Sequence, residues 1–187
     1  SSAGKAVIQA FGGTTTISNI RLRAPFSPYP ILHGNVDFHR LDLFDLTRTL
    51  EFGEINGVID GYIHNLRLLG STPSRFEAEF ATLEKGKRNI SVKALNNLTV
   101  LSQGGISAAL GRGIYRFIDF YRYQKIGIRC TLKHDVFRLE GTALPGDASY
   151  LVYGGLLPPK INIIAPGRDI SFKEMLKRLS RLDRAGR

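Results

Sequence analysis

The sequence predicts an α+β fold in which a curved antiparallel sheet forms a groove and amphipathic helices pack on or across it. Strand-like segments follow one another directly, with turn signals between them, whereas a repeating α/β fold would alternate strands with helices. Helical periodicity is confined to a short segment near residue 46, a long central segment and the C-terminal end. We expect a single domain over residues 1–187, and the abrupt ends indicate a fragment of a longer protein.

Residues 1–88 are expected to be mostly β-structure. Short apolar runs are separated by Gly12-Gly13 and by three prolines between Pro25 and Pro30, and both features are typical of turns. The expected elements are strands at Lys5 to Phe11, Thr14 to Ala24, Ile31 to His39, Gly57 to Leu69 and Arg75 to Leu83, and a short helix carrying Leu43, Leu46 and Leu50.

Residues 89–187 are expected to contain a pair of helices, further strands and a C-terminal helix. Apolar residues from Asn89 to Tyr121 recur at helical spacing. Gly104 and Gly105 would cost a straight helix about 2 kcal/mol relative to alanine, so we expect a hinge there. Ser171 and Glu174 are spaced as a capping box, which predicts the last helix. The expected strands are Lys125 to Lys133, Val136 to Leu144, Ser149 to Gly154 and Lys160 to Ile164, with a turn at His134-Asp135.

Some of these strands are apolar on both faces. Strict alternation in the strand from Gly57 to Leu69 places one apolar row on each face. The first row is Val58, Tyr62 and Leu66, and the second is Ile59 and Ile63. Strands of this kind are either sandwiched between two packed layers or line an apolar groove, and the pattern alone leaves both interpretations open.

The net charge of +10 is concentrated in two segments, Gly111 to Lys133 and Ser171 to Arg187. These segments could contact nucleic acid, anionic lipid head groups or an acidic partner, or they could be the solvated faces of apolar helices. Binding of single-stranded nucleic acid is the weakest alternative, because Phe117 and Tyr121 fall on the apolar helix stripe. No run of about 20 apolar residues predicts a membrane-spanning helix.

No group of residues predicts catalysis, and we expect a non-enzymatic protein without metal or cofactor. Cys130 is the only cysteine and falls on the apolar side of its strand, where it would act as a small hydrophobic residue. His33, Asp37 and His39 share a strand face but extend over more than about 13 Å, too far to bind one metal ion. The glycines beside Arg112 lack the remainder of a phosphate-loop motif.

Two blocks of the sequence resemble AsmA-like bacterial envelope proteins. The first block, Leu32 to Leu69, resembles the repeat of this family through Leu-His-Gly-Asn-Val-Asp, Leu41-Asp42-Leu43, Gly57 with Gly61, and Asn65-Leu66-Arg67-Leu68. The second resembles the C-terminal region of the YdbH-type members through Asn97-Leu98, Gly104-Gly105, Leu110-Gly111-Arg112-Gly113, Ile126 to Cys130, Tyr153-Gly154-Gly155 and Pro158-Pro159-Lys160-Ile161. The likeness extends from about Ile31 to Leu182.

The resemblance implies a periplasmic module of a lipid-transfer protein that bridges the two membranes of the bacterial envelope. Such proteins are anchored in the inner membrane by an N-terminal helix that is not in this chain. Their sheet forms a trough that conducts phospholipid acyl chains towards the outer membrane. The family also carries an older label as a dicarboxylate transporter, which would need a binding site for small acids, and the sequence shows none.

The resemblance also suggests which residues carry the function. Expected groove residues are Val58, Tyr62, Leu66, Ile126, Ile128, Cys130, Leu132, Phe137, Leu139, Leu151 and Tyr153. Expected head-group or partner contacts are Arg112, Arg116, Arg122, Lys177, Arg178 and Arg181. A small outer-membrane lipoprotein is the implied partner, pairing at an edge strand that contains Ile161 and Ile163. The alternative is a protein-interaction or scaffold module whose groove is filled by its own side chains; nucleic acid is not expected as a partner.

Overall fold

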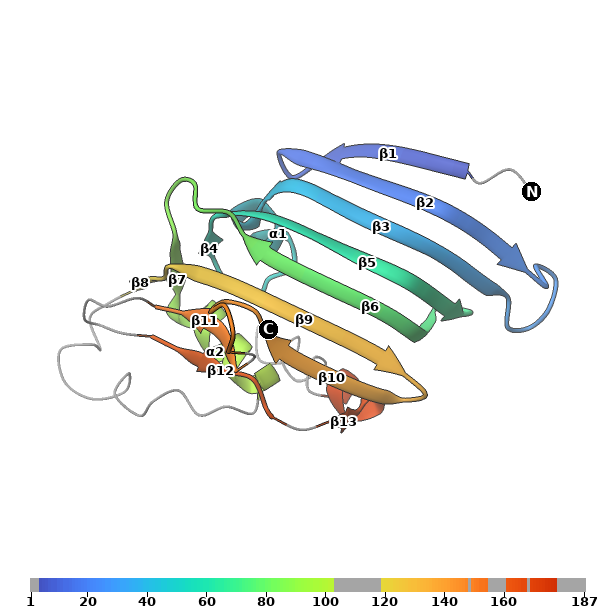
Figure 1. Cartoon of the computed structure of the whole chain (residues 1–187). Helices are drawn as coiled ribbons and strands as arrows, with labels where there is room; N and C mark the ends of the chain where they lie inside the picture. Colours follow the sequence, from blue (N-terminus) through green and yellow to red (C-terminus); the bar gives the residue numbers. More distant parts are fainter. Residues whose placement is uncertain (1–3, 103–118, 148, 155–160, 168, 178–187) are drawn as a thin grey trace.

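The computed structural model describes residues 4–102, 119–147, 149–154, 161–167 and 169–177. These residues form a long, open antiparallel sheet with helices on one side, so the predicted α+β class with a curved sheet is confirmed (Figure 1). In spatial order its strands are β1 (Gly4–Ala10), β2 (Gly13–Arg23), β3 (Ile31–Asp42), β5 (Val58–Leu69), β6 (Thr72–Thr82), β9 (Lys125–Lys133), β10 (Val136–Gly141) and β13 (Ile170–Ser171). Beside them, β11 (Tyr150–Tyr153) pairs with β9 and with β12 (Ile163–Ile164).

Tight turns connect β1 to β2 and β9 to β10, the two hairpins towards the ends of this sheet. His134 and Asp135 have φ values of 52° and 63°, the backbone of a two-residue type I′ turn, which confirms the turn expected there. The first hairpin turns one residue earlier than expected. Phe11 and Gly12 occupy its two central positions, with φ values of 50° and 68°, whereas Gly13 is already paired within β2.

The short helix α1 (Leu43–Thr49) begins where β3 ends, as the sequence predicted. The Asp42 carboxylate caps it by accepting hydrogen bonds from two backbone N–H groups of the first turn, 2.8 and 3.3 Å away. The buried Thr47 hydroxyl accepts a hydrogen bond of 3.2 Å from the backbone N–H of Ile55. This contact joins the helix to the segment that follows it.

The central helical prediction was too long at both ends. The observed helix is α2 (Val92–Ser102), and it is flanked by β7 (Asn89–Ser91) and β8 (Phe120–Arg122), which form a three-stranded sheet with β4 (Ile55–Asn56). Ile90 and Tyr121 pair directly across this small sheet, and both are buried. The expected hinge at Gly104 and Gly105 lies outside the described residues.

Residues 172–177 are helical, in agreement with the predicted C-terminal helix. The hydroxyl of Ser171, the residue before this helix, donates a hydrogen bond of 3.1 Å to the carboxylate of Asp135. This bond connects the start of the helix to the turn between β9 and β10. The rings of Phe76, Phe137 and Phe172 then pack together with centroid distances of 6.0 to 6.3 Å.

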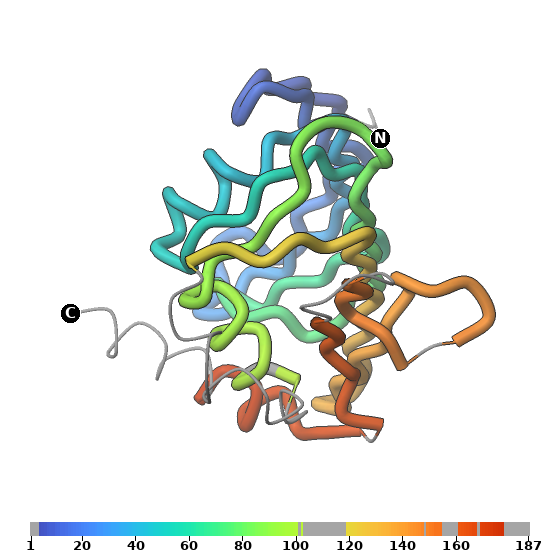
Figure 2. Tube along the Cα trace, turned by 90° about the vertical axis from the view of Figure 1, so that its left-hand side faces the viewer, coloured from blue at the N-terminus to red at the C-terminus, as the bar shows by residue number. Residues whose placement is uncertain are grey.

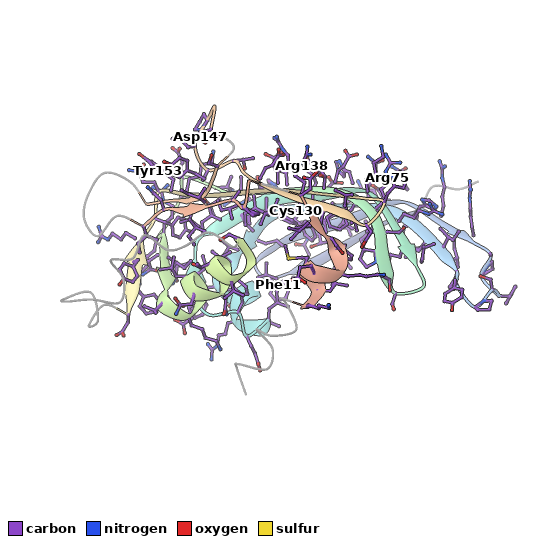
Figure 3. The ribbon with its side chains drawn as sticks, turned by 90° about the horizontal axis from the view of Figure 1, so that it is seen from below. Phe11, Arg75, Cys130, Arg138, Asp147 and Tyr153 are labelled. Carbon is purple, nitrogen blue, oxygen red and sulfur yellow. The ribbon has the colours of Figure 1, made fainter. Side chains whose placement is uncertain are left out.

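The long sheet has two chemically different faces. We call the side that carries the helices the inner face and the opposite side the outer face. Figure 3 shows Cys130 on the inner face, whereas Arg75 and Arg138 point away from the helices. Residues paired across neighbouring strands share a face, so the register assigns the paired positions of β1, β2, β3, β5, β6, β9 and β10 to one side.

The hydrophobic core lies between the inner face of β6, β9 and β10 and the helices and small sheet that cover it. Its largest fully buried apolar side chains are Tyr121, Ile90, Leu95, Leu132, Leu151, Ile161, Ile163 and Val152. Among the described residues, β1 and β2 contribute no side chain to this core. In Figure 2 the blue N-terminal hairpin lies at one end of the molecule, and α2 and the red segment after β13 lie at the other.

Two of the β-bulges in the long sheet, one in β2 and one in β5, change which residues of these strands face inward. Asn19 in β2 and Asn65 in β5 have φ values of 56° and 54°, a conformation that asparagine tolerates better than most residues. At each bulge the strand uses three residues where β3 uses two. Every side chain beyond the bulge therefore changes face, and Leu66 lies on the inner face although Tyr62 lies on the outer one.

Candidate functional site

The N-terminal part of the inner face is apolar and lies outside the core. We call it the open inner face, and its members are Ile17, Ile20, Leu22, Leu32, Val36, Ile63, Leu66 and Leu68. They come from β2, β3 and β5 and run across these strands in register, as in the row Ile17, Val36, Ile63. No charged residue occupies an inner-face position of these three strands.

Exposure separates the open inner face from the core. The side chains of Leu22 and Ile20 are 56% and 38% exposed, and the other six members are half-buried. The core residues of β9 and β10 on the same face are less than 9% exposed. Removing apolar surface from water contributes about 25 cal/mol of favourable free energy per Å². Covering the open inner face with an apolar ligand would therefore be favourable.

The structure places the eleven expected groove residues in three locations. Leu66 belongs to the open inner face. The second group, on β9 and β10, faces inward but packs in or against the core: Ile126, Ile128, Cys130, Leu132, Phe137 and Leu139. Val58 and Tyr62 lie on the outer face, so they cannot line the same groove as Leu66, because the bulge at Asn65 separates them.

The remaining two expected groove residues lie on β11. Leu151 is 1% exposed and belongs to the core. Tyr153 is half-buried, and Figure 3 shows it on the outer side of the sheet, where its ring lies 6.1 Å from that of Tyr150. The sequence therefore identified apolar strands correctly but did not separate open surface from packed core.

The expected contact residues are mostly outside the described part of the chain: this holds for Arg112, Arg116, Arg178 and Arg181. Arg122 is exposed on β8, and Lys177 is exposed at the end of the last helical segment. The expected partner strand is two residues long, as β12, and its Ile163 is buried, as is Ile161 just before it. These two side chains are part of the core and are not free to bind a partner.

The outer face carries pairs of charged and aromatic groups. The carboxylate of Glu79 accepts hydrogen bonds of 3.0 and 2.9 Å from Arg129, and these bonds raise the pKa of the guanidinium. His64 Nε2 lies 2.7 Å from an Asp37 oxygen, and His39 lies 3.4 Å from Asp60. No group of three or more histidine, cysteine or acidic side chains in the described residues could hold a metal ion.

Two titratable side chains of the packed part of the molecule are shielded from solvent, the buried Tyr123 and the half-buried Cys130. The Tyr123 hydroxyl donates a hydrogen bond of 2.7 Å to the backbone oxygen of Asn56, and burial raises the pKa of this hydroxyl. Burial also raises the pKa of the Cys130 thiol to about 12. At neutral pH Cys130 is therefore a protonated, poorly nucleophilic thiol on the inner face.

Comparison with protein-family models, with curated proteins and with solved structures finds no match for this chain. Within the described ranges, no helix has the length and apolar character needed to cross a membrane. The conclusions on function therefore depend on the geometry and chemistry of the sheet.

Proposed function

We propose that the protein is a non-enzymatic module of a lipid-transfer protein and that its open inner face contacts phospholipid acyl chains. The observation that carries the proposal is the uncharged apolar surface across β2, β3 and β5, which the core does not include. An acyl chain has no hydrogen-bonding groups, so a surface without charged residues suits it. The resemblance to AsmA-like envelope proteins supports the same function and a periplasmic location.

In this proposal the two ends of the inner face have separate roles. The helices and the small sheet close the inner face over β9 and β10, where burial of residues such as Leu132 stabilises the fold. The half over β2 and β3 remains available to an acyl chain. Movement of lipid towards the outer membrane would require this surface to continue into neighbouring parts of a longer protein.

Lipid analysis of two matched variants tests the proposal. Ile17 and Ser18 are adjacent on β2, but Ile17 pairs with Val36 on the inner face and Ser18 pairs with Asn35 on the outer face. We expect phospholipid to copurify with the wild-type chain expressed in bacteria, to be lost in Ile17→Asp and to be retained in Ser18→Asp. Mass spectrometry that finds no phospholipid on the wild type, or the same amount on both variants, would contradict the proposal.

A protein-interaction module is the second candidate, and the edge strand β1 favours it. In the described residues β1 pairs only with β2, so its other backbone edge is available for strand addition. Its Val7 and Ile8 are 56% and 48% exposed, one on each face. If this edge recruits a partner, Val7→Pro should abolish binding of the partner while leaving the lipid content unchanged, because proline removes a backbone donor.

A further inference from the structure

A row of basic side chains crosses the outer face of the sheet. The register pairs Arg21 with His33, His33 with Arg67, Arg67 with Arg75, and Arg75 with Lys133. These residues come from five neighbouring strands, so the row is about 19 Å long at the usual strand spacing of about 4.8 Å. Figure 3 shows Arg75 on this face, directed away from the helices.

Like charges placed directly opposite each other destabilise a sheet. The arginines of the row have no compensating partner: in the described residues no carboxylate lies within 4.0 Å of Arg21, Arg67 or Arg75. The nearest acidic residue along β6 is Glu77, and it forms no ion pair with a described cation. The acidic side chains of Asp37, Asp60 and Glu79 on this face are paired with His64, His39 and Arg129, respectively.

Four members of the row, Arg21, His33, Arg67 and Arg75, line a cleft of about 500 Å³. Its lining residues are Asn19, Arg21, Arg23, His33, Gly34, Asn35, Asn65, Leu66, Arg67 and Arg75, and they include no acidic residue. The two bulges place Arg21, Arg23 and Arg67 on this side of the sheet, because strict alternation would have turned them inward. Partial burial, followed by the charges of the neighbouring arginines, lowers the pKa of His33.

The cleft also offers neutral donors. The side-chain oxygen of Asn35 accepts a hydrogen bond of 2.9 Å from the backbone N–H of Asn65. This bond fixes the amide and leaves its NH₂ group able to donate to a ligand. Guanidinium groups and amides together match the oxygen atoms of phosphate, since the guanidinium plane binds two oxygens at once.

From this arrangement we infer that the outer face binds a ligand with two or more phosphate groups, held by Arg21, Arg67 and Arg75. One phosphate can bridge neighbouring strands about 4.8 Å apart, but the three arginines extend over about 14 Å, which requires at least a second anionic group. The three arginines lie on the face opposite to the open inner face, and Leu66 is the one member of the open inner face among the lining residues of the cleft. Because the arginines alone carry the inference, it does not depend on the lipid proposal, and either can be wrong without the other.

The test compares two double variants that remove the same charge. Arg21→Gln/Arg67→Gln removes two members of the row, whereas Arg48→Gln/Lys85→Gln removes two exposed cations elsewhere. Titration calorimetry at low salt with sodium tripolyphosphate should show saturable binding to the wild type, weakened about tenfold for each arginine removed from the row. The control variant should bind within about twofold of the wild type.

Two further measurements complete the test. Vesicle binding shows whether the phosphate groups belong to a lipid, and the melting temperature shows whether the arginines serve only to stabilise the fold. If the ligand is a lipid head group, vesicles with phosphatidic acid should bind and vesicles of phosphatidylcholine alone should not, and the row variant should lose this binding. The row variant should also have a higher Tm than the wild type, because two of the mutually repelling charges have been removed. Equal losses in both double variants, equal binding to both vesicles, or no binding of either phosphate probe would overturn the inference.

Discussion

The two halves of the inner face have the same apolar character and different surroundings. Over β9 and β10 the inner face is closed by helices and by the small sheet, and its Leu132 is 1% exposed. Over β2 and the first part of β3, from Leu32 to Val36, it is outside the core, and its Leu22 is 56% exposed. The comparison teaches that apolar strand residues are packed into the core in one half and stay partly exposed in the other, although their sequence patterns look alike.

The largest expected difference between the halves is in the free energy of unfolding. Ile90 is fully buried, so Ile90→Ala should lower the free energy of unfolding by about 3 kcal/mol, through lost burial and the cavity that remains. Ile17 lies outside the core, and Ile17→Ala should lower it by less than about 1 kcal/mol. Urea unfolding measures both values, and equal losses would mean that the two halves are equally packed.

A smaller loss is expected when Tyr123 is replaced by phenylalanine. Tyr123→Phe removes the hydrogen bond to the Asn56 oxygen and leaves that acceptor without its partner, which should lower the free energy of unfolding by about 1.5 kcal/mol. The matched control is Tyr29→Phe, because Tyr29 is 74% exposed. Thermal unfolding should distinguish the two, and a loss as large at Tyr29 would refute this assignment.

The bulge at Asn65 is needed for the open inner face, because it turns Leu66 and Leu68 towards that face. Asn65→Ala should lower the free energy of unfolding by about 1 kcal/mol, since the φ of 54° is unfavourable for residues with a Cβ. Asn65→Gly should leave the stability nearly unchanged, because glycine adopts this conformation readily. A glycine variant that is as unstable as the alanine variant would show that the Asn65 side chain, rather than its backbone, stabilises the bulge.

A separate prediction concerns how the stability changes with pH through the ionisation of Cys130. An unfolded thiol loses its proton near pH 8.5, whereas the folded Cys130 keeps it to a pKa of about 12. The unfolded state then binds fewer protons, so the stability should fall as the pH rises through this window. The slope should be reduced in Cys130→Ala.

The rate of thiol labelling compares the accessibility of the inner face at Cys130, against the core, with its accessibility at position 17, on the open inner face. At pH 8, Cys130 should react slowly with a thiol reagent, because it is protonated and lies against the core. A cysteine introduced by Ile17→Cys in the Cys130→Ala background should react much faster. Similar rates at the two positions would argue that the inner face over β2 is also covered.

The sequence predicted most strands and the turn at His134-Asp135, and it placed the first hairpin turn one residue too late, because these features depend on local patterns. The turn at His134 and Asp135 and the alternation in β9 need no information from distant residues. The extent of the central helix could not be predicted in the same way. Ile90 and Tyr121 continue a helical spacing, but their positions are decided by pairing across 31 residues of chain.

The candidate site was predicted only in part, for a similar reason. Assigning Leu66 to the face of Tyr62 assumed an unbroken strand, whereas the bulge at Asn65 reverses the alternation. A signal was present in the sequence: the apolar positions change from odd to even numbers at both Asn19 and Asn65. The basic row had no such signal, because it is formed by strand register between residues far apart in the chain.

The most direct test of the central claim compares two positions on β5 that face opposite sides of the sheet. A photoreactive phenylalanine analogue is introduced at Leu66, on the open inner face, or at Tyr62, on the outer face, and the chain is irradiated in the bacterial cell. We predict that phospholipid becomes crosslinked at position 66 and not at position 62. Crosslinking at both positions to the same extent, or none at position 66, would contradict the claim that the inner face holds acyl chains.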